Sequence, residues 1–148
     1  MLAIVGIGDG LGIIAIEAKV DEGFDKTVEE WRRLDSAGKA RRIVGLCALL
    51  DVKADSIGPI RYQLFHRVAS ALIEARRYRA TQATMIVQSW CPDRTSFDDY
   101  VAFGRLLGFN KIRLDALTET KAFDGIGLRL GWSAETLRQA ESNASPAA

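Results

Sequence analysis

Histidine, cysteine and proline are scarce in this sequence, whose 148 residues include one His, two Cys and three Pro. The single histidine, His66, is too little for a histidine-rich metal site, and a Ser-His-Asp triad would have to use it. No nucleophile motif of the G-x-S-x-G type is present. A catalytic His66 therefore stays open, beside the plainer interpretation of a hydrogen-bonded residue at the edge of the core.

The two cysteines give no metal-binding pattern. Cys47 lies in an apolar run, which predicts a buried free thiol, and Cys91 begins a Cys-Pro-Asp turn with no CxxC around it. Reduced cysteines of this kind fit a cytoplasmic protein.

Long apolar runs and an excess of one charge are also missing. No stretch is long enough to span a bilayer, and no basic residue opens the apolar N-terminus as it would in a signal peptide. The formal net charge is +1, so any nucleic-acid contact has to come from a local basic face. We expect no membrane partner, one domain over residues 1–141, and a flexible polar tail over 142–148.

The hydrophobic pattern predicts an α/β fold. Two apolar runs around an Asp-Gly turn are typical of a β-hairpin, and later segments alternate between helical and strand spacing. We expect a mixed central sheet that opens with this hairpin and is flanked by helices. The predicted elements are strands 2–7 and 11–20, helices from 25 or 27 to about 34, 40–52 and 61–80, a strand 82–90, a helix from 93–96 to 107, a strand near 125–132 and a short helix after 133.

Four glycines at alternate positions from 6 to 12 resemble a dinucleotide-binding loop. That fingerprint needs G-x-G-x-x-G, and its third glycine would fall on Leu11 or Ile13. The residues that follow favour a strand over the helix that the fingerprint requires. A flexible hairpin turn is the plainer interpretation, and nucleotide binding is kept as the weakest hypothesis.

Glu17-Ala18-Lys19 is the strongest chemical signature. Period-two alternation places Glu17 and Lys19 on one face of the predicted strand, and both faces are apolar up to Glu17. Such a strand is expected to be central and covered on both sides, where a carboxylate and an ammonium are costly unless they pair or bind something. A carboxylate suits Mg²⁺, and an ammonium can orient water or stabilise phosphate charge. A surface ion pair at a strand end is the alternative.

The motif and its context resemble the PD-(D/E)xK nuclease superfamily, and the likeness is greatest to small bacterial members with no assigned function. The likeness covers residues 2–132 and is carried by Glu17-Ala18-Lys19-Val20, the segments 62–67 and 71–75, and the strand that ends Val87-Gln88-Ser89-Trp90. It implies a restriction-endonuclease-like fold and hydrolysis of phosphodiester bonds that depends on Mg²⁺ or Mn²⁺. It also implies Glu17 and the Ala18 carbonyl as metal ligands, with Lys19 and Gln63 as catalytic residues.

The implied partner is nucleic acid, with DNA expected first, and a homodimer is a compatible assembly. On the helix predicted over 61–80, Gln63 and Arg67 begin a polar stripe whose first turn is expected to face the E-x-K site. Arg67 and His66 are the residues that we expect to contact nucleic acid. A solvated helix face remains the alternative for this stripe.

One part of the superfamily pattern is missing, namely an acid on the strand before the E-x-K strand. Asp9 is the only acid before Glu17, and eight extended residues separate the two by roughly 26 Å, although ligands of one metal lie within about 5 Å of each other. The missing acid is expected at or before Met1, unless Asp21 or Glu22 replaces it. The alternative function is a catalytically inactive nuclease fold that serves as a binding or assembly module.

Overall fold

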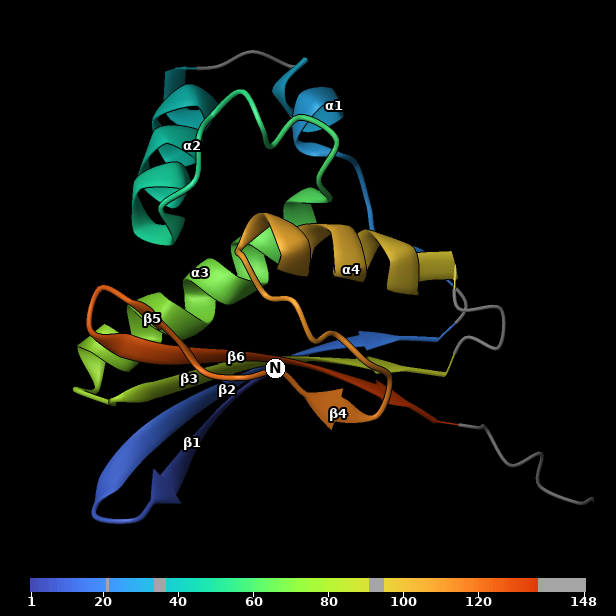
Figure 1. Cartoon of the computed structure of the whole chain (residues 1–148). Coiled ribbons are helices and arrows are strands. Elements are labelled where there is room, and N and C mark those ends of the chain that lie inside the picture. The colour runs from blue at the N-terminus through green and yellow to red at the C-terminus, as the bar shows by residue number, and fades with distance from the viewer. Residues whose placement is uncertain (21, 34–36, 91–94, 136–148) are drawn as a thin grey trace, which may run out of the picture.

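The computed structural model describes residues 1–20, 22–33, 37–90 and 95–135. Within these ranges, six strands form one mixed sheet, and the helices lie on one of its faces (Figure 1). The sheet order is β1-β2-β3-β6-β4, and β5 pairs with β6. The strands are β1 (Leu2–Ile7), β2 (Gly10–Lys19), β3 (Gln82–Ser89), β4 (Ala116–Leu117), β5 (Lys121–Phe123) and β6 (Ile126–Ala134). The predicted α/β class, with a mixed sheet that opens with a hairpin, is confirmed.

The hairpin turns at Gly8 and Asp9, where Gly8 takes a positive φ of 56° that a residue with a side chain rarely adopts. β1 and β2 pair antiparallel, with Leu2 opposite Ala15, and β2 then runs parallel to β3. β2 continues as a strand through Gly12, so the helix that dinucleotide binding needs is absent there, and that hypothesis is removed.

β2 is a central strand, as predicted, but helices cover only one of its faces in the part of the chain described. Ile13 and Ala15 are buried under the helices, and Glu17 and Lys19 follow them on the same face. On the other face Ile16 is half-buried and Ala18 is exposed. The expectation of cover on both sides was wrong, because apolar residues on both faces of a strand do not require a second helical layer.

Two helices pack directly on the sheet. α3 (Tyr62–Arg77) presents the apolar stripe that its sequence predicts, and α4 (Thr95–Leu106) packs Tyr100 and Phe103 into the same core. α3 is shorter than the predicted 61–80, because Tyr78 leaves the helical conformation and Arg79 has a positive φ of 54°. The buried residues of α3 are Leu64, Phe65, Val68, Ala69, Ala71, Leu72 and Ala75.

Two further helices lie above α3 in Figure 1. α1 (Val28–Arg32) starts with a capping box between Thr27 and Glu30. α2 (Ala37–Leu50) starts three residues before the predicted 40 and includes Gly38, which we expected to end the preceding helix. A glycine in the first turn is tolerated, since the N–H groups there have no partner within the helix. Cys47 is buried on α2, as predicted.

The C-terminal part holds two short strands that the sequence did not predict, β4 and β5, both antiparallel to β6. β6 extends to Ala134, so a strand stands where the short helix was expected to begin. Asp21, Cys91 and the predicted tail lie outside the described residues. No helix in the described ranges combines the length and the apolar character that crossing a membrane requires.

Candidate functional site

The E-x-K motif ends β2 at the carboxyl edge of three neighbouring parallel strands. Lys19 pairs in register with Ser89 at the end of β3, and Ser89 pairs with Ala134 at the end of β6. Open α/β sheets bind ligands outside the carboxyl ends of their strands. The motif therefore lies at the edge of the sheet where a site is expected.

Glu17 and Lys19 point to the same side of β2, which confirms the predicted alternation. Both are buried, with 6% and 3% of their surface exposed, and the Lys19 ammonium lies 3.5 Å from a Glu17 carboxylate oxygen. The alternative of a surface ion pair was wrong, because α3 covers this end of the strand. An open cleft around the two side chains stays a prediction.

Gln63 faces this pair from the first turn of α3, as predicted. Its Oε1 accepts a hydrogen bond from the Lys19 ammonium at 2.9 Å and another from the backbone N–H of Asp25 at 3.1 Å. Lys19 also donates to the Gly23 carbonyl at 3.2 Å, and its ammonium lies 5.2 Å from the centre of the Phe24 ring. The ammonium is thus held by oxygen acceptors and an aromatic face at once.

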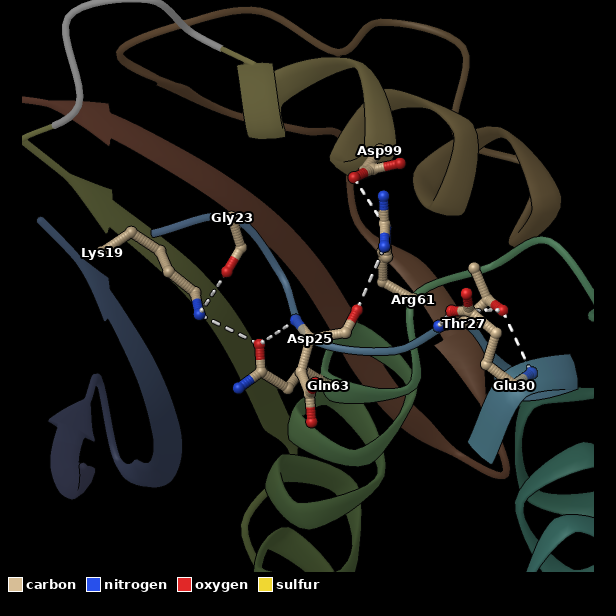
Figure 2. Close-up of polar contacts among 8 residues, drawn as sticks. All are labelled: Lys19, Gly23, Asp25, Thr27, Glu30, Arg61, Gln63 and Asp99. Atoms are coloured by element: carbon tan, nitrogen blue, oxygen red, sulfur yellow. Dashed lines mark hydrogen bonds and ion pairs between the residues drawn. The ribbon is translucent and has the colours of Figure 1, made fainter. Parts of the chain in front are cut away.

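Residues 22–27, which lead into α1, cross the start of α3 close to the Lys19 ammonium (Figure 2). Arg61, the residue before α3, donates to the Asp25 carbonyl at 3.2 Å and forms an ion pair with Asp99 of α4 at 2.8 Å. The backbone of Tyr62 donates to the Lys26 carbonyl at 3.0 Å. These bonds tie the segment to the start of α3 and to α4, and the segment in turn holds Lys19 and Gln63 through Gly23 and Asp25.

Arg67 lies one turn beyond Gln63 on α3, and its Nε–H donates to the second carboxylate oxygen of Glu17. The polar stripe that Gln63 and Arg67 begin does face the site, as predicted. Arg67 contacts Glu17 there, the residue that the resemblance implies as a metal ligand. Its side chain is 36% exposed, whereas that of Glu17 is 8% exposed. Glu17 is therefore a buried anion flanked by two cations.

The Ala18 carbonyl points toward the β1 side of the sheet. Ile16 exchanges both backbone hydrogen bonds with Met1, and the Lys19 carbonyl accepts from Trp90 next to β3. Because carbonyl directions alternate along a strand, Ala18 points the same way as Ile16. The register places no described residue opposite it. That carbonyl can serve as a ligand beside Glu17.

His66 lies next to Arg67 on α3 and is exposed. Desolvation, followed by the nearby charges of Arg67 and Arg42, lowers its pKa, and the Glu17 carboxylate opposes this shift. Among the charges that act on the imidazole, those of Arg67 and Arg42 each outweigh that of Glu17. His66 therefore lies on the electropositive rim of the site.

A second acid next to Glu17 is missing from the residues that the structure covers. With Leu2 opposite Ala15, the register places the position across from Glu17 before Met1, because the turn is centred on Gly8 and Asp9. No group of three His, Cys, Asp or Glu side chains with the spacing of a metal site occurs in the described ranges. Among the described residues, Glu22 and Asp25 are the next acids along the chain after Glu17.

Sequence reasoning missed several residues that shape this site. Ser89 is 2% exposed beside Lys19, and Phe24 lies against Trp132 with ring centres 6.4 Å apart. The alternation 83, 85, 87, 89 of the predicted strand placed Ser89 on the inner face, and that signal could have found it. No local pattern indicated Arg61 or Phe24, since their roles arise from contacts between distant segments.

The fold and site define an α/β domain with a charged cluster at the carboxyl edge of its parallel strands. A family model described as "Domain of unknown function (DUF6946)" matches residues 1–137, and the chain belongs to this family. No curated protein and no solved structure matched the chain.

Proposed function

We propose that this domain is a restriction-endonuclease-like nuclease that hydrolyses phosphodiester bonds of nucleic acid, DNA first, with Mg²⁺ or Mn²⁺. The observation that carries the proposal is the meeting of Glu17, Lys19 and Gln63 in one buried hydrogen-bonded cluster. The three come from β2 and α3, 44 residues apart along the chain for Lys19 and Gln63. A structural role alone would not require an ammonium to be buried beside a carboxylate.

For a divalent metal, the described residues of the motif offer one carboxylate, which also pairs with Lys19 and Arg67, and one backbone carbonyl. Mg²⁺ is bound by one or two carboxylates, with water and substrate phosphates completing the shell. Glu17 would supply a carboxylate oxygen, and Ala18 would supply a carbonyl beside it. When bound, the metal would supply Lewis-acid chemistry to the phosphodiester.

Lys19 is the residue of this chain that would act on the reacting groups. Gln63 and the Gly23 carbonyl hold its ammonium in place, so no side-chain entropy is lost when a phosphate arrives. The ammonium can orient the attacking water and stabilise the charge that develops on the phosphate oxygens. Gln63 acts through Lys19 and is a positioning residue.

A plasmid cleavage assay with Mg²⁺ or Mn²⁺ tests this proposal. Lys19→Met and Glu17→Gln are each expected to lower the cleavage rate by about 100-fold or more, the usual effect of removing an electrostatic contact to the transition state. Lys111→Met is the matched control, because Lys111 is exposed and lies on a different segment. Equal cleavage by Lys19→Met and Lys111→Met would refute the assignment.

A second candidate is a nuclease-fold module that binds nucleic acid without cleaving it. The observation that favours it is the double engagement of Glu17, which contacts both Lys19 and Arg67 and thereby loses much of its negative field. Binding of a duplex by the whole chain, with no cleavage in either metal, would select this candidate over the first.

A further inference from the structure

β1 is an open edge of the sheet. It stands first in the strand order, and its one neighbour among the described strands is β2. Ile16 exchanges both backbone hydrogen bonds with Met1, at 2.8 and 2.9 Å, and such an exchange recurs at every second residue of an antiparallel pair. The residues between the exchanging ones therefore turn their backbone N–H and C=O groups away from β2. These residues are Leu2, Ile4 and Gly6.

This edge lacks the features that keep edge strands from pairing. Native proteins protect such edges with charged side chains, proline, bulges or a covering segment. The six residues of β1 include no charge and no proline, and their register with β2 runs without a bulge. Leu2 is 47% exposed and Ile4 is 50% exposed. A regular, apolar edge that no other described strand covers is a template for a further strand.

The apolar surface continues from β1 onto the helical layer. Leu2 and Ile4 project on the helix side of the sheet, as do the buried residues of β2 with which they pair. Together with Glu74 and Tyr78 they line a hollow of about 320 Å³, and Tyr78 is 42% exposed. A strand added beside β1 would therefore gain apolar contacts above the sheet as well as backbone hydrogen bonds.

A second β1 strand matches this edge. Two copies that run antiparallel about a twofold axis at Ile4 place Ile4 opposite Ile4, and Leu2 of each copy opposite Gly6 of the other. Three pairs then exchange two hydrogen bonds each, six in all, whereas a shift of two residues in either direction leaves four. A side chain built at Gly6 would meet nothing within 4 Å, so Leu2 of the second copy has room there.

The twofold arrangement is also closed. The opposite edge of the sheet is made of β4 and β5, which have two and three residues. Among the described strands, β1 is therefore the one long open edge. Pairing β1 with β1 occupies this edge in both copies, which gives a closed dimer and not a fibre.

We propose that the chain forms a homodimer by antiparallel pairing of two β1 strands in this register, which joins the two sheets into one. The twofold axis is perpendicular to the sheet, so the helices of both copies lie on the same face. The inference is independent of the proposed function, because the pairing uses neither metal nor nucleic acid and no residue of the E-x-K motif.

The test is sedimentation velocity of the whole chain from about 1 to about 300 µM, because small interfaces bind weakly. The mass is expected to rise from that of one chain to that of two. Ile4→Lys places two ammonium groups on the axis, at residues whose Cα atoms are about 5.5 Å apart, and should weaken association about tenfold or more. Val44→Lys is the matched control, since Val44 is 66% exposed on α2, outside the sheet, and it should associate like the natural chain.

A mixture of two variants tests the register. Ile4→Glu alone should associate as weakly as Ile4→Lys, but the two mixed should recover association, because opposite charges then face each other across the axis. Such recovery requires both variants to be folded. Association that survives Ile4→Lys, or folded variants that associate no better when mixed, would overturn this interface.

Hydrogen exchange of the natural chain tests the same pairing without a variant. The outward amides of Leu2, Ile4 and Gly6 should become more protected as the protein concentration rises, since a paired amide exchanges only after the strands separate. A chain that stays monomeric up to the highest concentration overturns the proposal. A dimer whose β1 amides gain no protection also overturns it.

Discussion

The two ends of α3 carry the same kind of ion pair in opposite surroundings. Near its start, Arg67 pairs with Glu17, a carboxylate with 8% of its side chain exposed, whereas near its end Arg76 pairs with Asp124, which is 66% exposed. Exposed pairs contribute little to stability, and a buried charge needs its partners. The difference indicates that the first pair belongs to a site and the second to the solvated surface.

The largest difference in stability between the two ends of α3 is expected when the carboxylate of each ion pair is replaced by an amide. Glu17→Gln leaves Lys19 and Arg67 close together without their anion, which is expected to lower the free energy of unfolding by about 3 kcal/mol. Asp124→Asn should change it by about 1 kcal/mol or less. Urea denaturation of both variants measures the contrast, and equal effects would mean that Glu17 is not an organising anion.

The second largest effect is expected on nucleic-acid affinity when Arg67 is replaced. Arg67→Gln is expected to weaken duplex binding about tenfold, because a hydrogen bond to a charged group contributes about 1.5 kcal/mol or more. The slope of binding against salt should fall by about one unit. Arg76→Gln should leave the duplex affinity and the salt slope unchanged if Arg76 takes part only in a surface ion pair. Fluorescence anisotropy over a range of salt concentrations measures both quantities. A loss shared by the two variants would point to a diffuse basic face instead.

The buried hydroxyl of Tyr100, on α4, is expected to give a smaller effect on stability. Tyr100 is fully buried against Trp132, its hydroxyl has no hydrogen-bond partner among the described residues, and burial raises its pKa. Tyr100→Phe should therefore raise the free energy of unfolding by about 1 kcal/mol. Tyr78→Phe, at an exposed position after α3, should leave it unchanged. Thermal unfolding of both variants tests this, and a loss in Tyr100→Phe would reveal a partner for the hydroxyl.

The sequence predicted the part of the site that depends on local periodicity. Alternation along a strand places Glu17 and Lys19 together, and helical spacing places Gln63 and Arg67 on one face of α3. The partner of Arg67 could not be predicted in this way, because it depends on how α3 crosses β2. A phosphate was expected for Arg67, and the structure places the Glu17 carboxylate there.

The same limit explains what was missed in the fold. The hairpin, α3, β3 and α4 are long enough to show their periodicity, and their predicted bounds lie within a few residues of those observed. β4 and β5 have two and three residues, which are too few to show any period. They form because each pairs with the backbone of β6. The one-sided cover of β2 likewise follows from helix placement, which no strand pattern contains.

The smallest expected effect is on the titration of His66, which is the only histidine and so gives one unambiguous NMR signal. Desolvation lowers its pKa below 6.5, Arg67 and Arg42 lower it further, and Glu17 opposes them. Because the pKa of the folded state is depressed, the unfolded chain binds this proton more tightly. The contribution of His66 to stability should therefore be complete above the unfolded pKa and be lost as the pH falls through the folded pKa.

Variants at the two ends of α3 sharpen this measurement. Arg67→Gln removes a neighbouring positive charge and should raise the pKa of His66, Glu17→Gln should lower it, and Arg76→Gln should leave it unchanged. A bound duplex should raise it, because phosphate favours the protonated imidazole. A His66 pKa that responds to Arg76→Gln as strongly as to Arg67→Gln would mean that the positive field covers the whole helix, and the distinction between the two ends of α3 would then have no electrostatic basis.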